Sequence, residues 1–110
     1  MCATSSSGSP VNDYLVFLEY EAPQVPEEDL VELRRSEAAR SRELQSQGII
    51  LGLWRLPGRR ASCSLWRVRD ADALHEAMVS LPFWPWMSAT VTPLARHPNW
   101  GGGPDAAPGG

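Results

Sequence analysis

The pattern of apolar and polar residues in the first part of the chain predicts a strand followed by a helix. Residues 14–20 are rich in aromatic and β-branched side chains, which is typical of a strand. Pro26 is suited to begin a helix, and the acidic residues 27–29 suit the positive end of the helix dipole. The helical pattern continues to Gln47, and Gly48 is the expected stop.

A hairpin, a second helix and a last strand complete the predicted domain. Residues 49–56 and 61–68 are the strands of the hairpin, which turns at Pro57-Gly58. Either Asp70 or Asp72 is expected to cap a helix that runs through residue 75 to about residue 80. An aromatic loop over residues 81–86 precedes a strand over residues 89–95, where Pro93 requires a sheet edge or a bulge. This order predicts an α+β, ferredoxin-like βαββαβ fold.

Both faces of the predicted sheet carry apolar side chains. Leu15 and Phe17 lie on the opposite side of the first strand from Tyr14, Val16 and Leu18. The second strand is apolar on both sides as well. The helices of such a domain cover only one face of the sheet, which leaves the other face apolar and wet. We therefore expect a homodimer or a higher homo-oligomer in which two sheets pack face to face.

Composition and charge narrow the class of protein. The chain has 110 residues and a net charge of -3, which argues against a nucleic-acid binder because such a protein carries a basic patch. Residues 1–12 and 101–110 are tails rich in Ser, Gly and Pro, so the folded domain is expected at 13–100. Without a signal peptide or a membrane-spanning stretch, we expect a cytoplasmic protein. The two cysteines, Cys2 and Cys63, offer neither metal-binding spacing nor a redox pair.

Glu37 is the most unusual residue in the pattern. It falls within the apolar stripe of the first helix, which is formed by Leu30, Leu33 and Leu44. A charge on such a stripe costs free energy unless it is paired, and burial moves the pKa of a carboxyl group towards that of a usable general base. Two interpretations stay open at this point: a functional carboxylate, or a helix rotated so that Glu37 reaches water.

Several short motifs occur together in the order and spacing of one known family. The most specific is the loop Leu81-Pro82-Phe83-Trp84-Pro85-Trp86-Met87. The others are Gly48, Leu53-Trp54-Arg55, Gly58, Ala73-Leu74-His75 and Arg96-His97-Pro98. On these motifs the chain resembles the muconolactone isomerase family over roughly residues 14 to 99.

The resemblance implies a dimeric α+β barrel, assembled into a ring-like decamer, that uses no metal and no organic cofactor. It implies an enzyme of aromatic degradation that shifts a proton within a butenolide and converts muconolactone into the enol-lactone of 3-oxoadipate. By register from Gly48, the Lys-x-x-Glu of the family falls on Arg34 and Glu37. Glu37 thereby becomes the candidate base and proton shuttle, with Arg34 as its catalytic neighbour. Whether desolvation or Arg34 has the larger effect on the pKa of Glu37 stays open.

The candidate substrate-binding residues are Arg55, Arg60, Trp54, Trp84 and His97. Arg55 and Arg34 are suited to hold a substrate carboxylate, because a guanidinium group binds such a group through two hydrogen bonds. Alternatively, Arg55 is a surface charge beside the turn. The tryptophans equally fit packing or a subunit interface. His97 fits either the closing of a neighbouring subunit's pocket or the capping of the last strand.

The chain departs from the family at positions that would surround a substrate. Arg60 stands where the family often has a tyrosine, and Ser62 and Cys63 replace polar or aromatic residues. The expected substrate is therefore a small anionic lactone or enone, not necessarily muconolactone. The alternatives are an isomerase, dehydratase or cyclase acting on a polyketide-like intermediate, a cofactor-free oxygenase on the same fold, and a non-catalytic ligand-binding module.

Overall fold

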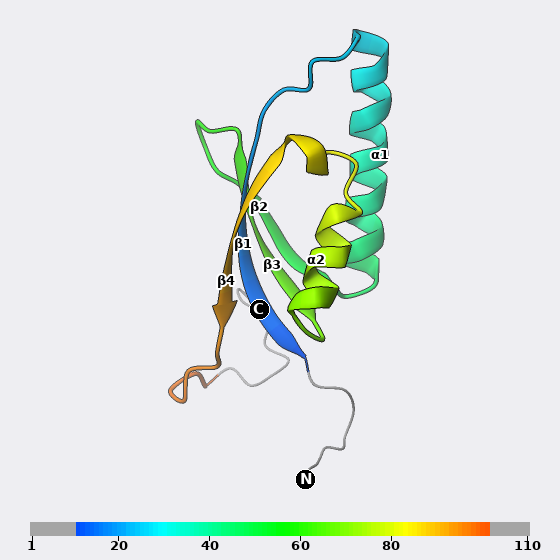
Figure 1. Cartoon of the computed structure of the whole chain (residues 1–110). Helices are drawn as coiled ribbons and strands as arrows, with labels where there is room; N and C mark the ends of the chain where they lie inside the picture. Colours follow the sequence, from blue (N-terminus) through cyan, green and yellow to red (C-terminus); the bar gives the residue numbers. More distant parts are fainter. Residues whose placement is uncertain (1–10, 102–110) are drawn as a thin grey trace.

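The computed structural model describes residues 11–101 and shows the α+β arrangement that the sequence predicts (Figure 1). Its elements are β1 (Asn12–Tyr20), α1 (Glu27–Ser46), β2 (Ile50–Arg55), β3 (Ala61–Val68), α2 (Ala71–Val79), the short 3-10 helix η1 (Trp84–Trp86) and β4 (Met87–Leu94). The predicted tails at residues 1–10 and 102–110 lie outside the described residues. Within residues 11–101, neither helix is long and apolar enough to cross a membrane.

The four strands form one antiparallel sheet in the order β2-β3-β1-β4. Both helices lie on the same side of this sheet (Figure 1). β4 occupies an edge, as Pro93 requires, because proline has no N–H to donate to a second neighbour. A bulge between Ile50 and Gly52 interrupts the pairing of β2 with β3.

The ends of the helices follow from local chemistry. α1 begins directly after Pro26 and ends at Ser46, and Gly48 follows two residues later with a φ of 76° that favours glycine. Asp70, and not Asp72, caps α2, because its side chain accepts a hydrogen bond of 2.8 Å from the N–H of Ala73. This hydrogen bond also lowers the pKa of Asp70.

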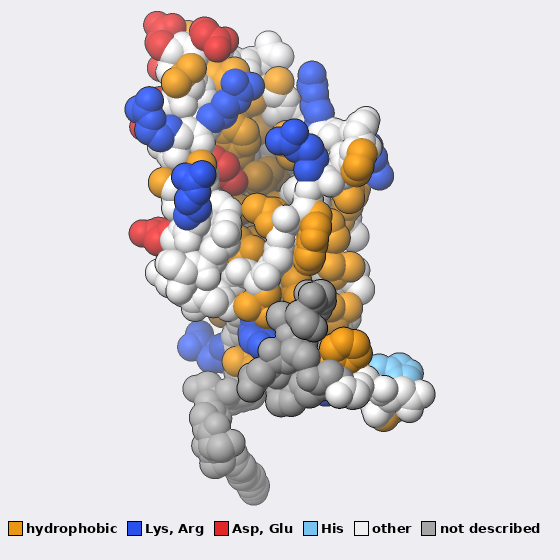
Figure 2. All heavy atoms as spheres, turned by 180° about the vertical axis from the view of Figure 1, so that it is seen from behind, with side chains coloured by type: hydrophobic (Ala, Val, Ile, Leu, Met, Phe, Trp, Pro, Cys, Tyr) orange, Lys and Arg blue, Asp and Glu red, His pale blue; other side chains and the backbone are white. Residues whose placement is uncertain are grey.

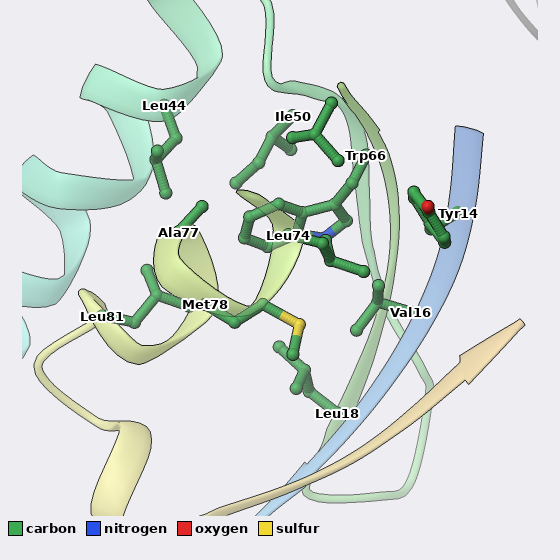
Figure 3. Packing of buried hydrophobic residues seen from close by; sticks show 11 residues of the cluster. Tyr14, Val16, Leu18, Leu44, Ile50, Trp66, Leu74, Ala77, Met78 and Leu81 are labelled. Carbon is green, nitrogen blue, oxygen red and sulfur yellow. The ribbon is translucent and has the colours of Figure 1, made fainter. Parts of the chain in front are cut away.

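The core lies between the sheet and the two helices (Figure 3). Its largest fully buried side chains are Trp66, Leu44 and Val16. Trp66 donates its indole N–H to the hydroxyl of Ser64 over 2.8 Å, so the buried polar atoms of this strand are paired. Leu44 is the only fully buried residue of α1. The first half of α1 therefore contributes no fully buried side chain to the core.

The outer face of the sheet is apolar at its centre. The pairing of the strands puts Leu15 and Phe17 of β1 on this face together with Cys63 and Trp54. Leu15 is 37% exposed and Trp54 is 47% exposed. The Trp54 ring lies over Gly52, where a Cβ atom would clash with it. No helix of residues 11–101 covers this face (Figure 1).

Candidate active site

A cleft of about 710 Å³ opens between the first half of α1 and the hairpin of β2 and β3. Figure 2 shows this hollow from behind, with basic side chains on both of its sides and an acidic side chain within it. Its volume falls in the range of about 300–1,000 Å³ that is typical of small-molecule sites. The bulge in β2 and the shallow packing of α1 leave this space open.

Glu37 extends from α1 into this cleft and is held there by the backbone of a distant loop. Its Oε1 atom accepts a hydrogen bond of 3.0 Å from the N–H of Phe83. The side chain is half-buried. The other carboxylate oxygen makes no hydrogen bond to residues 11–101, so it is available to a ligand.

The surroundings of Glu37 change its acidity. Burial raises the pKa of Glu37, because the ionised carboxylate is less well solvated in the cleft than in water. The hydrogen bond from the Phe83 N–H lowers the pKa, but its effect is the smaller of the two. The question left open by the sequence is thereby answered: desolvation dominates, and the opposing effect comes from Phe83 and not from Arg34.

Three arginines line the same cleft: Arg34 from α1, and Arg55 and Arg60 from the hairpin. All three are exposed, and none forms an ion pair with another residue of the described chain. The neighbouring Arg59 differs, because it pairs with Glu19 at 3.0 Å. Guanidinium groups without a partner at a cleft are ready to bind an anion.

The structure brings most of the predicted site residues together, but not Trp84 and His97. Trp54 lines the cleft beside the arginines. Trp84 packs against the core, and its ring meets the ring of His75 edge-on at 6.1 Å between centroids. His97 is exposed beyond the end of β4, where its Nδ1 accepts a hydrogen bond from the N–H of Asn99. Neither Trp84 nor His97 lines the cleft of its own chain.

The sequence analysis missed the role of the Phe83 backbone, although it singled out the surrounding loop. Pro82 and Pro85 have no N–H, and the N–H of Trp84 bonds to the carbonyl of Leu81 over 2.9 Å. The Phe83 N–H is therefore the donor of this segment that remains available to a side chain. A loop with two prolines has few backbone N–H donors, and this shortage is the signal in the sequence that a remaining donor can have a special role.

The cleft also contains three serines, Ser41, Ser62 and Ser64, of which only Ser62 was expected from the sequence to lie near a substrate. The hydroxyl oxygen of Ser64 already accepts a hydrogen bond from the indole N–H of Trp66. Among residues 11–101, no group of three or more His, Cys, Asp or Glu side chains is placed to hold a metal ion. The arrangement offers a half-buried carboxylate for proton transfer and guanidinium groups for binding an anion.

Comparisons with known proteins point to one family. The family model described as Muconolactone delta-isomerase matches residues 13–100. The Muconolactone Delta-isomerase of Cupriavidus pinatubonensis is 34% identical over 87 residues, covering 78% of this chain and 95% of that protein. The enzyme of the same name from Rhodococcus opacus is 36% identical over 75 residues, covering 68% of this chain and 76% of that protein. The crystal structure of muconolactone isomerase at 3.3 Å resolution superimposes with a TM-score of 0.74 and 28% identity, covering 80% of this chain and 93% of that one.

Proposed function

Because the chain belongs to the muconolactone delta-isomerase family, we propose that it isomerises muconolactone or a closely related anionic lactone, with Glu37 as base and proton shuttle. The observation that carries the assignment of the base is the placement of Glu37. Its carboxylate lies half-buried in a cleft of small-molecule size, with one oxygen held by Phe83 and the other available.

The reaction needs one proton to leave a carbon of the lactone system and to return at another carbon. Glu37 takes the first proton as the electrons of the broken C–H bond enter the conjugated system. The double bond moves by one position, and the protonated Glu37 then delivers the same proton to the second carbon. No atom is gained or lost, so one carboxylate suffices for both transfers. The raised pKa of Glu37 supports this role, because it makes the carboxylate a stronger base than an ordinary glutamate.

The arginines stabilise charge and do not exchange protons. A guanidinium group stays protonated in proteins, so Arg34 cannot serve as the acid or base at this position. We assign Arg34 and Arg55 to the substrate's carboxylate and to the negative charge that develops on the lactone during proton removal. On the β2 side of the cleft, Leu53 borders the ring of the bound lactone, because it pairs with the cleft residue Ser64, whereas the ring of Trp54 lies on the outer face of the sheet.

Two variants test the assignment of Glu37. Glu37→Gln keeps the shape of the side chain and an acceptor for the Phe83 N–H, but it removes the base. We expect kcat for muconolactone to fall by at least about 10³-fold, because general base catalysis contributes about 10²–10⁴-fold. Glu32→Gln is the matched control, since Glu32 is an exposed carboxylate on α1 that pairs with Arg35 outside the cleft. A Glu37→Gln enzyme with near-normal kcat would show that another group is the base.

We further propose that two copies of the chain pair through the outer face of the sheet, within a dimeric α+β barrel that assembles further into rings. The exposed apolar residues Leu15 and Trp54 on that face support this proposal, because a monomer rarely leaves such a patch in water. The ion pairs Asp13–Arg67 and Glu19–Arg59 lie at the two ends of β1 and border the apolar centre. A role of His97 in substrate binding would then be played at the cleft of a partner subunit.

Sedimentation velocity tests this pairing. Leu15→Asp puts a charge at the centre of the face and should reduce the sedimentation coefficient to that of a smaller species. Val31→Asp is the control, because Val31 is 46% exposed on α1, away from the outer face. Far-UV circular dichroism confirms that each variant is folded. If folded Leu15→Asp sediments like the wild type, this face is not the interface.

A further inference from the structure

Arg60 stands at the boundary between two hollows. A second hollow of about 540 Å³ adjoins the cleft, on the side of the hairpin turn and η1. Five residues line both spaces, namely Tyr20, Glu21, Arg60, Ala61 and Met87. The carbonyl of Arg60 accepts a hydrogen bond of 3.1 Å from the N–H of Tyr20, which ties this residue to the end of β1.

Charges of both signs line this boundary, and its arginines Arg55 and Arg60 form no ion pair within residues 11–101. Arg60 lies two residues before Ser62, which pairs with Arg55 across the hairpin, so both arginines border the same side of the cleft. The carboxylates that face this region are Glu21, which lines both hollows, and Glu19, which is already paired with Arg59.

Three guanidinium groups, those of Arg34, Arg55 and Arg60, line the cleft beside the carboxylates of Glu21 and Glu37. Arg34 and Arg55 can hold a single carboxylate between them, and Arg60 is the arginine that lines both the cleft and the second hollow. An unpaired arginine beside an empty hollow fits a second acidic group on an arm of the substrate. A Trp side chain, Trp86, also lines this hollow and offers an apolar surface to such an arm.

We propose that Arg60 binds a second carboxylate, so that the preferred substrate is a dianionic lactone whose additional acidic arm reaches from the cleft into the adjoining hollow. This inference rests on the proposed function, because it assumes that the lactone ring binds beside Glu37. It makes Arg60 a specificity-determining residue: the lactone with two carboxylates is favoured over muconolactone, which has one.

The test compares two substrates and two variants. Wild type, Arg60→Gln and Arg42→Gln are assayed with muconolactone and with a butenolide of the same ring that carries a second carboxylate on its side chain. Arg42 is the matched control, since it is an exposed arginine without an ion pair in the described chain and lies outside both hollows. The ratio of kcat/KM for the dianionic over the monoanionic lactone should fall about tenfold in Arg60→Gln, as expected from the loss of one exposed charge-assisted contact. The ratio should be unchanged in Arg42→Gln.

A binding measurement separates this inference from the proposed function. Isothermal titration with the saturated, unreactive analogues of both lactones reports affinity without turnover. Wild type should bind the dianionic analogue more tightly, and this preference should weaken in Arg60→Gln and at high salt. Lactone turnover with an unchanged preference in Arg60→Gln overturns the inference but leaves the proposed function intact. Conversely, the preference in binding without turnover of either lactone contradicts the proposed function alone.

Discussion

The substitution Glu37→Gln separates the charge of this side chain from its shape. Glutamine keeps a carbonyl oxygen that can accept the hydrogen bond from the Phe83 N–H, at 3.0 Å in the wild type. It removes the ionised group that burial in the cleft destabilises. Residues held in a destabilised state for catalysis are sites where replacement stabilises the fold. The free energy of unfolding should therefore rise although activity is lost.

The sign and size of this effect follow from the raised pKa of Glu37. A carboxyl group whose pKa is raised by folding stabilises the fold while it is protonated, and this contribution is lost as the pH rises through the folded-state pKa. Above that pH the wild type bears a penalty that glutamine avoids. Because Glu37 is only half-buried, water screens the charge, and we expect about 0.5–1 kcal/mol. In a domain of this size, that corresponds to an increase in Tm of about 2–8 °C.

Thermal unfolding at a series of pH values measures this difference. Wild type and Glu37→Gln are compared between pH 4 and pH 8 at one protein concentration, since assembly makes Tm depend on concentration. The gain in Tm should be largest at pH 8 and should vanish at acidic pH, where both side chains are neutral. Glu32→Gln should show no such pH-dependent gain. A Glu37→Gln protein that is less stable at pH 8 would refute the argument that the carboxylate is desolvated.

Three further predictions concern the cleft and the strands of the sheet. The value of kcat/KM should fall as the pH drops through the raised pKa of Glu37, so its acidic limb should lie above the pKa of an ordinary glutamate; a pH–rate profile checks this. Gly52→Ala should push the ring of Trp54 away from the strand and, because this ring lies on the outer face of the sheet, lower the sedimentation coefficient, while stability changes by less than about 1 kcal/mol because the ring is exposed enough to rotate. Ser64→Ala should cost about 1–3 kcal/mol in urea unfolding, because it leaves the buried indole N–H of Trp66 without its acceptor.

The order and type of the elements could be predicted from the sequence because their signals are local. Pro26 and Gly48 mark the two ends of α1 through their own backbone preferences. The start of β4 was less predictable: the strand begins at Met87, two residues before the predicted start, because Met87 pairs with Tyr20 of β1. Pairing between strands that are distant in the sequence cannot be recognised from the residues at the start of β4 alone.

The site residues that could be predicted are those that interrupt a regular pattern in the sequence. Glu37 was identified because a carboxylate interrupts an apolar stripe, and that stripe turned out to border a cleft. Arg55 could be proposed from the motif Leu53-Trp54-Arg55, and Arg60 from its place where the family often has a tyrosine. The contribution of Phe83 was not predictable, since its N–H is a backbone group and lies 46 residues from the carboxylate. For the same reason, the sequence suggested Arg34 as the group opposing desolvation, where the structure has the Phe83 N–H.

The hydrogen bond between Phe83 and Glu37 gives the proline-rich loop a role beyond packing. The two prolines cannot donate, and Trp84 donates to Leu81, so the loop presents a single N–H to the cleft. That donor holds one carboxylate oxygen of Glu37 and leaves the other without a hydrogen bond to residues 11–101. It also limits how far burial raises the pKa of Glu37. In the proposed role of Glu37, a base that must both accept and return a proton needs a pKa between the two extremes, and burial and this backbone N–H act on that pKa in opposite directions.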